Sequence, residues 1–428
     1  MKKSAIVVAL LLGVTVLNLT ADPADKQATP ETIALWRYLK GLSEGPSPKV
    51  LFGQYLALAY GVGWQNEEGR SDFKSAIGKP PSFVEWGFGG IEKSQDDTFL
   101  IQGGTIGWVR EHVRKAYAQG TIQSFSWHSI NLVTGKGVYV REGPSEWAVS
   151  KITPQGSASD PNEVKKLTDA LDKIAGFFLS LKDDAGRPIP VIFRPWHEQN
   201  GGWFWWGRGQ RSADNTKDVQ DFVALWKFTV HYLRDVRGVH NVLYAFASDV
   251  GDWKTDKVSI WDEYPGDDIV DIVGLDAYWG YRAKGKEDTK ILAESEKGRK
   301  AMLCLDEVIG TAQKHQKIAA FSEVGGKSSG TATDVTANPE AAKGWWMKLM
   351  KLLKEDPNRF HIAYLMTWAN RPGKPGENLH KVQRYMPVAA LGDDVADVKS
   401  FAGDPHIMLL DESKAKWLPM IKASTKTQ

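Results

Sequence analysis

The stretch VIFRPWHEQNGGWFWWG, residues 191–207, joins an apolar run to a cluster of polar and aromatic side chains. Its first three residues, 191–193, are typical of the end of a buried strand. Arg194, His197 and Glu198 follow directly, and a loop with three tryptophans comes next. A carboxyl group held among apolar rings keeps its proton more easily than one in water. The stretch therefore predicts a strand that ends in a site for proton transfer.

Eight apolar runs, this one included, have the length and composition of strands. They span residues 50–57, 82–87, 121–128, 190–197, 241–248, 269–278, 317–324 and 362–368. Between most of them lie amphipathic stretches with helical spacing, among them 162–181, 222–233 and 341–353. Strand–helix alternation favours parallel βαβ units, and eight units favour an α/β fold, a closed (β/α)8 TIM barrel forming one catalytic domain over residues 22–428.

A doubly wound sheet is the alternative fold. It is weakened because Phe52-Gly53-Gln54 follows the first run, where a Gly-rich phosphate loop belongs. Towards the end of the chain, residues 371–403 lack a clear period, which indicates a long loop over one face. A C-terminal helix is expected near residues 412–421.

Composition excludes some partners and suggests another. The formal net charge of the 428 residues is +2, so no strong field points to nucleic acid or to membrane lipid. The 18 tryptophans are many, and suggest an aromatic binding surface beside the core. Cys304 is the one cysteine, which excludes an internal disulfide framework. Its apolar, helical surroundings favour a buried structural thiol.

Residues 1–21 have the pattern of a secretory signal peptide. Lys2 and Lys3 precede an apolar run, 5–17, that is too short for a comfortable membrane span, and Leu19-Thr20-Ala21 offers a cleavage site before Asp22. An uncleaved anchor is the alternative reading. We expect a secreted or periplasmic protein with no membrane span in the mature chain, and a monomer by default.

Polar residues at the ends of the predicted strands are the candidates for chemistry, because catalytic groups of such barrels stand at the C-terminal strand ends. These residues are Trp127, His128, His197, Glu198, Asp249, Asp276, Tyr278, Glu323 and Trp368. Glu198 and Glu323 end the fourth and seventh runs and would face each other across the barrel mouth. A retaining glycosidase needs such a pair, roughly 5–5.5 Å apart, as acid/base and nucleophile.

Several motifs together resemble glycoside hydrolase family 26, which is best known for β-mannanases. They are R-P-x-H-E with N-G-x-W-F-W-W at 194–206, S-E-x-G at 322–325, G-L-D-x-Y at 274–278, S-W-H at 126–128, T-W at 367–368 and SFAGDPHIML at 400–409. They occur in the family's order and cover nearly the whole chain after the first 21 residues. The motif on the fourth run is the most specific of them.

The resemblance implies roles for individual residues. Glu198 would be the general acid/base, with a pKa raised by its aromatic surroundings, and Glu323 the ionised nucleophile, oriented by a hydrogen bond from Tyr278. Arg194 would lie under the site and fix a carboxylate. The sugar-binding residues would be His128, His197, Trp203, Tyr278, Trp368 and Trp127. Asp249 and Asp276 are expected to be structural, and Trp205 and Trp206 could belong to the core.

The resemblance points first to β-1,4-mannan, glucomannan or galactomannan as the substrate. Mixed-linkage β-glucan and β-1,3-xylan are the alternatives, and a barrel that binds glycans without cleaving them is a further one. Endo action is favoured. Residues 54–55 and 85–88 are expected near distal sugar subsites.

Two other motif matches predict nothing further. The G-x-S-x-G pattern at 326–330 is not followed by a helical sequence, which indicates a loop. His197-Glu198 has no second histidine in register for a zinc site. We therefore expect no catalytic metal and no other cofactor.

Overall fold

A closed barrel of parallel strands forms the centre of the computed structural model, which describes residues 22–140, 147–208, 216–251, 261–279, 297–326 and 344–424. The barrel strands are β1 (Val50–Tyr55), β4 (Phe83–Gly87), β7 (Ile122–Trp127), β8 (Val191–Pro195), β9 (Val242–Asp249), β10 (Ile272–Trp279), β11 (Ile318–Gly326) and β12 (Tyr364–Thr367). They pair in this order, and parallel pairing of β12 with β1 closes the ring. A short ninth strand, β13 (Ile407–Met408), pairs with the start of β1.

Each of the eight predicted runs overlaps one barrel strand, with β9, β10 and β11 extending one or two residues past their runs, so the predicted (β/α)8 fold is confirmed. The alternative of a doubly wound sheet is wrong, because an open sheet has no pairing between its first and last strands. The runs were recognisable because these strands are buried on both faces and carry few surface residues. Every residue of β1 and β9, for example, is buried.

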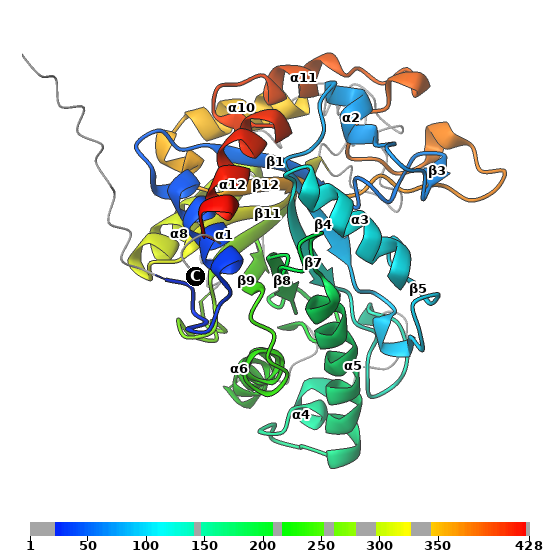
Figure 1. The fold of residues 1–428 in the computed structure, drawn as a ribbon, viewed down its shortest axis with the longest axis vertical. Helices are drawn as coiled ribbons and strands as arrows, with labels where there is room; N and C mark the ends of the chain where they lie inside the picture. The colour runs from blue at the N-terminus through cyan, green and yellow to red at the C-terminus, as the bar shows by residue number, and fades with distance from the viewer. Residues whose placement is uncertain are drawn as a thin grey trace, which may run out of the picture.

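Helices cover the outside of the barrel (Figure 1). The longer ones are α1 (Pro30–Glu44), α3 (Ile106–Ala118), α5 (Pro161–Ser180), α6 (Thr216–His231), α8 (Lys297–Lys314), α10 (Trp345–Lys354) and α12 (Leu410–Ser424). Shorter ones are α2 (Asp72–Ile77), α4 (Ala148–Ile152) and α11 (Ala396–Ala402). The helix expected at 162–181 is α5, which begins at Pro161 because the Asp160 side chain caps the N–H of Asn162.

Other predicted helices differ at their ends. The stretch 222–233 falls in α6 and in a π-helical turn, η4 (Tyr232–Val236), that continues it. The stretch 341–353 corresponds to α10, with residues 341–343 outside the described residues. The expected C-terminal helix is longer than predicted and forms α12. Cys304 is a buried free thiol on α8, and burial raises its pKa to about 12.

The expected long loop at 371–403 is only partly a loop. It contains two 3-10 turns, η6 (Leu379–Lys381) and η7 (Ala389–Leu391), and the whole of α11. Two further 3-10 turns are η1 (Ile91–Lys93) and η5 (Pro357–Phe360). Two small hairpins, β2 (Tyr60–Gly61) with β3 (Trp64–Gln65) and β5 (Leu100–Ile101) with β6 (Gly104–Thr105), follow barrel strands.

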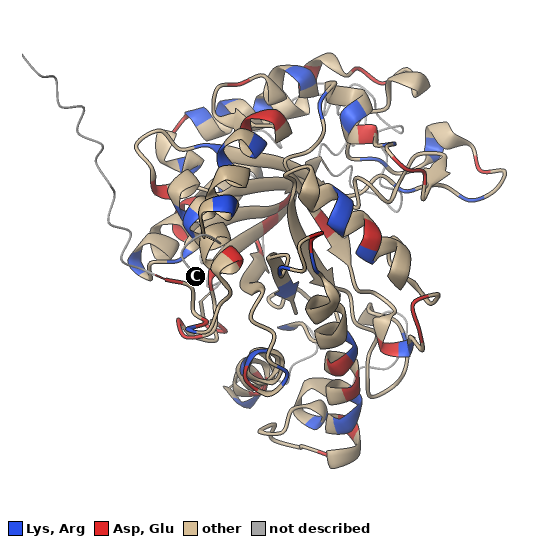
Figure 2. Ribbon diagram, in the orientation of Figure 1, with Lys and Arg blue, Asp and Glu red and all other residues tan. Residues whose placement is uncertain are grey.

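Charges of both signs are interspersed over the outer helices (Figure 2), in keeping with the small net charge. Within the described residues, no helix combines the length and apolar composition needed to cross a bilayer. The predicted signal segment, 1–21, and most of the G-x-S-x-G pattern lie outside the described residues.

Candidate active site

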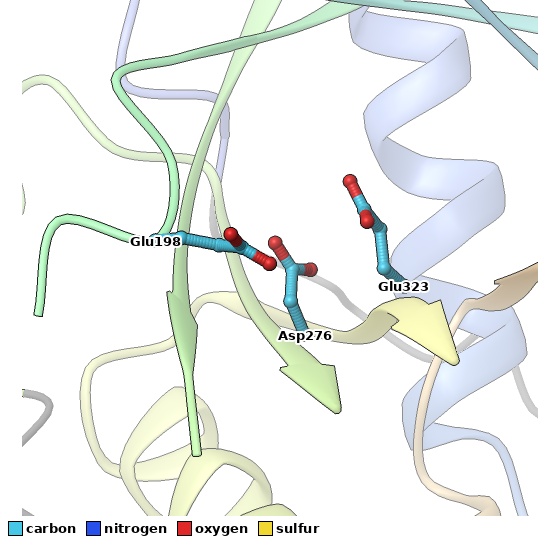
Figure 3. A group of neighbouring side chains, drawn as sticks. All are labelled: Glu198, Asp276 and Glu323. Atoms are coloured by element: carbon cyan, nitrogen blue, oxygen red, sulfur yellow. The ribbon is translucent and has the colours of Figure 1, made fainter. Parts of the chain in front are cut away.

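Three carboxylates meet at the C-terminal end of the barrel. Glu198 follows β8, Asp276 is on β10 and Glu323 is on β11. One oxygen from each of the three lies within 4.8 Å of the others, and Figure 3 shows the side chains of Glu198 and Asp276 directed towards each other. This separation of Glu198 and Glu323 is nearer to that of a retaining pair of carboxyls, roughly 5–5.5 Å, than to that of an inverting pair, about 6.5–9.5 Å.

An unusual backbone conformation places Glu198. Strand β8 ends at Pro195, earlier than expected, because Trp196 (φ 51°) and Glu198 (φ 55°) are both left-handed. This conformation costs a non-glycine residue on the order of 1–3 kcal/mol and needs support from its surroundings. The N–H of Glu198 donates to the carbonyl of Ala247 (2.9 Å), and the buried Trp196 indole donates to Thr229 (3.0 Å). These bonds fix the turn that directs Glu198 into the mouth.

A β-bulge places Glu323. Between the pairs Gly274–Ala320 and Asp276–Glu323, strand β11 has one residue more than β10, and its register with β12 shifts at the same point. At the bulge, the hydroxyl of Ser322 donates a hydrogen bond to Asp276 Oδ1 (2.6 Å). Bulges next to active sites commonly redirect a side chain. Here the bulge sets Glu323 directly beside Asp276.

Arg194 binds three carboxylates inside the barrel. Its guanidinium, fully buried on β8, donates to Glu85 Oε1 (2.6 Å), to Asp276 Oδ2 (2.7 Å) and to Glu323 Oε1. Glu85 also accepts a hydrogen bond from Ser124 (2.9 Å). Arg194 was expected to fix one carboxylate, and it binds three. It is the centre of an ion network that joins β4, β8, β10 and β11.

Glu198 and Glu323 receive different donors. Glu198 Oε2 accepts from the Trp203 indole (2.5 Å), whereas Glu323 accepts from Arg194 and from the Tyr278 hydroxyl (2.5 Å). Burial raises the pKa of Glu198 well above its usual value, and the charge of Glu323 raises it further. Burial raises the pKa of Glu323 to about 8, with Arg194 opposing the shift. A proton shared by the pair therefore belongs on Glu198, because a cation stabilises the charge on Glu323.

The three carboxylates are also the groups that could hold a metal ion. Arg194 already provides positive charge to two of them, Asp276 and Glu323, so a cation would have to compete with the guanidinium. Like charges at this distance repel. The donor set therefore fits a metal poorly, and the absence of a catalytic metal stays a prediction.

Two histidines lie beside the carboxylates. The rings of His128 and His197 are 4.7 Å apart, edge to face, and His128 is also 5.5 Å from Trp368. Burial lowers the pKa of His128 to about 3 and that of His197 well below its usual value, with the charge of Arg194 acting in the same direction. Both rings are neutral at pH 7. The Nδ1 atoms of both lack a hydrogen-bond partner within the described part of the chain.

Aromatic side chains of the predicted sugar site lie around this centre. Trp203 is 37% exposed, and Tyr278 and Trp368 are partly exposed. One face of Trp368 stacks on Tyr55, with ring centroids 4.1 Å apart and planes at 7°. Its other face is therefore the one left for a ligand.

The structure contradicts one predicted sugar contact, Trp127. This side chain is fully buried, its indole donates to Glu92 (2.8 Å), and its ring packs on Trp196. A side chain with no exposed surface and with its indole N–H bonded to Glu92 presents no face to a sugar ring. Its place is behind the barrel wall.

Trp205 and Trp206 are core residues. Their indoles donate to the carbonyls of Ser129 and His197, both at 2.9 Å, and hold the loop after β8. The structure leaves Asp249 at the end of β9, where its carboxylate accepts from the N–H of Gly251 (2.8 Å).

Sequence reasoning missed two residues near the carboxylates. Glu85 was expected near a distal subsite, but it binds Arg194 inside the barrel. A carboxylate within the apolar run 82–87 was the available signal, because a buried charge needs a partner. Tyr385, in the segment 371–403, reaches back to contact Tyr278. No periodicity in that segment could have indicated it.

Comparisons with known proteins agree with this geometry. Residues 24–310 match the profile of glycosyl hydrolase family 26. The chain is 31% identical over 389 residues to a mannan endo-1,4-β-mannosidase of Bifidobacterium adolescentis, covering 89% of this chain but only 34% of that protein. It thus spans about a third of this relative.

Solved structures match over nearly the full length. One is a family 26 β-mannanase from Bacteroides ovatus, with a TM-score of 0.71 and 29% identity, covering 90% of this chain and 97% of that one. Another is the catalytic domain of an endo-β-1,4-mannanase from Bacillus sp. JAMB-750, with a TM-score of 0.72 and 30% identity, covering 93% and 95%. The chain therefore belongs to glycosyl hydrolase family 26.

Proposed function

We propose that this chain is an endo-acting β-mannanase that hydrolyses β-1,4-mannosidic bonds in mannan, glucomannan or galactomannan with retention of configuration. The observation that carries the proposal is the pair Glu198 and Glu323, with oxygens within 4.8 Å and different hydrogen-bond donors. The names of the matched relatives support the same substrate class.

The proposed reaction has two steps. Glu323, oriented by Arg194 and Tyr278, attacks the anomeric carbon while Glu198 protonates the leaving oxygen, and a glycosyl ester forms on Glu323. Glu198, now ionised, removes a proton from water as that water attacks the same carbon and releases Glu323. Two displacements at one carbon restore the starting configuration. Trp203 and the open face of Trp368 would bind sugar rings on either side of the bond.

The test is product release from linear mannan, glucomannan, galactomannan, barley β-glucan and xylan, with Glu323→Ala as the matched control. Oligosaccharides of mixed length from the mannans are expected, and NMR of the first products should show the β-anomer. Cleavage of β-glucan or β-1,3-xylan alone would replace the substrate but keep the mechanism. Binding without cleavage by the wild-type chain would instead support a glycan-binding barrel.

We also propose that residues 1–21 are removed as a signal peptide and that the mature chain acts as a secreted or periplasmic monomer. The charged start and short apolar run of this segment support its removal. Expression of the full chain in a bacterial host, followed by N-terminal sequencing of the exported product, tests the cleavage before Asp22. Light scattering of the same product tests the monomer.

A further inference from the structure

The tyrosine that bonds to Glu323 is itself packed against a second tyrosine. The ring of Tyr385, from the segment between β12 and α11, meets the ring of Tyr278 edge to face, with centroids 5.6 Å apart and planes at 65°. Tyr278 in turn donates its hydroxyl to Glu323 Oε2 at 2.5 Å. A χ1 rotation of Tyr278 would carry its hydroxyl away from Glu323, whereas a χ2 rotation would leave the oxygen in place. The ring of Tyr385 packs against the ring that such a χ1 rotation would have to move.

A glycine makes room for this pair. Gly325 lies beside Tyr278 in the β10–β11 register, two residues after Glu323. A Cβ at Gly325 would lie 2.6 Å from Cδ1 of Tyr385 and 3.0 Å from Cδ1 of Tyr278. The backbone of Gly325 carries no positive φ, so the glycine is required by this contact rather than by its own conformation.

The position of Tyr385 is fixed from behind. The N–H groups of Tyr385 and Met386 both donate to Oδ1 of Asn370 at 2.9 Å. The amide of Asn370 donates to Asp72 (2.7 Å) and to the carbonyl of Met386 (2.9 Å). Asn370 is 1% exposed and all of these bonds are internal, so the segment is held firmly at this point. The Tyr385 hydroxyl accepts a hydrogen bond from the Gln383 amide (2.8 Å).

We propose that Tyr385 is a positioning residue, whose ring, seated over Gly325, holds the Tyr278 hydroxyl on the nucleophile Glu323. The inference rests on the proposed role of Glu323. In this proposal the segment after β12 helps to orient the nucleophile Glu323. The essential contact is made by the ring of Tyr385 and not by its hydroxyl.

Kinetics of three variants test this role. Tyr385→Ala should lower kcat by about 10-fold to 100-fold with little change in KM, the loss expected when a hydrogen bond to a charged group is removed. Tyr385→Phe keeps the ring and should retain wild-type rates. Gly325→Ala, which inserts a methyl group between the tyrosines, should reproduce the loss, and serves if Tyr385→Ala does not fold.

A double-mutant cycle separates positioning from general damage. Tyr278→Phe removes the hydroxyl itself, so Tyr385→Ala should cost almost nothing more in that background. Independent, multiplicative losses would overturn the proposal, as would a Tyr385→Phe variant that is as slow as Tyr385→Ala.

A titration provides a readout that does not depend on the substrate. Protein labelled with 13C at glutamate side-chain carboxyls should show Glu323, assigned from its loss in Glu323→Gln, titrating at higher pH in Tyr385→Ala than in wild type or Tyr385→Phe. The direction follows because the Tyr278 donor favours the carboxylate. Glu323 also faces Arg194, Glu85, Asp276 and Glu198, which are unchanged in all three proteins. An unmoved midpoint overturns this inference, whereas inactivity of the wild type on every glycan refutes the proposed function alone.

Discussion

The indole N–H of Trp203 donates a hydrogen bond of 2.5 Å to Oε2 of Glu198. Trp203 was predicted as a platform for a sugar ring, and its 37% exposure leaves it free for that contact. Through this bond Trp203 also lowers the pKa of Glu198, because a hydrogen-bond donor to a carboxylate stabilises the ionised form. The tryptophan therefore moderates the pKa that burial raises.

Replacing Trp203 by phenylalanine should extend activity to higher pH. The change removes the donor and keeps an aromatic face, so the pKa of Glu198 rises further. Glu198 must be protonated to act as the acid, and kcat/KM falls on the alkaline side as that proton is lost. The alkaline limb of the pH profile should move to higher pH in Trp203→Phe. Trp205→Phe is the control, because Trp205 is in the same loop as Trp203 and its indole bonds to the carbonyl of Ser129 rather than to Glu198. This change should leave the alkaline limb unmoved.

Removal of the nucleophile should abolish turnover without unfolding the barrel. Glu323→Ala should lower kcat on the natural glycan by several orders of magnitude, because no covalent intermediate can form. The circular dichroism spectrum should match that of the wild type, since Arg194 keeps Glu85 and Asp276 as partners. A Glu323→Ala enzyme with wild-type rates would contradict the assignment.

Removal of the acid should depend on the leaving group. Glu198→Ala should lose about 10²–10⁴-fold on a polysaccharide, the usual contribution of a general acid. An aryl glycoside with a nitrophenolate leaving group needs no proton, so its first step should proceed almost normally and a burst of phenolate should appear. Stopped-flow absorbance measures this burst. Equal losses on both substrates would argue against Glu198 as the acid.

The fold could be predicted from sequence because burial on both faces makes barrel strands into apolar runs, as in β1 and β9. Glu198 and Glu323 could be placed because Glu198 directly follows one such run, 190–197, and Glu323 lies near the end of another, 317–324. The partners of Arg194 could not, because Glu85 and Asp276 reach it only through closure of the barrel. The contact of Tyr385 with Tyr278 could not be predicted either, because the sequence of an aperiodic segment does not indicate which distant strand it contacts.

Arg194 should be important to stability as well as to the site. Arg194→Met leaves Glu85, Asp276 and Glu323 buried without their cation, which typically costs about 3–5 kcal/mol. The midpoint of denaturant unfolding should fall accordingly. Adding Glu85→Gln and Asp276→Asn removes two of the uncompensated charges and should recover part of the loss. A single variant as stable as the wild type would show that the network is not what holds these carboxylates.

Trp127 offers a test of the corrected sugar site. Trp127→Phe removes the indole that donates to Glu92, whose other oxygen, Oε2, has no partner within the described residues. Loss of a buried hydrogen bond of this kind should lower the free energy of unfolding by about 1–3 kcal/mol. KM for the glycan should stay at the wild-type value, because the side chain is buried behind the wall that carries His128. Trp203→Ala is the matched comparison, with the opposite pattern expected, a raised KM and near wild-type stability. A raised KM for Trp127→Phe with an unchanged unfolding midpoint would instead support Trp127 as a sugar contact. The indole would then have to become exposed when substrate binds.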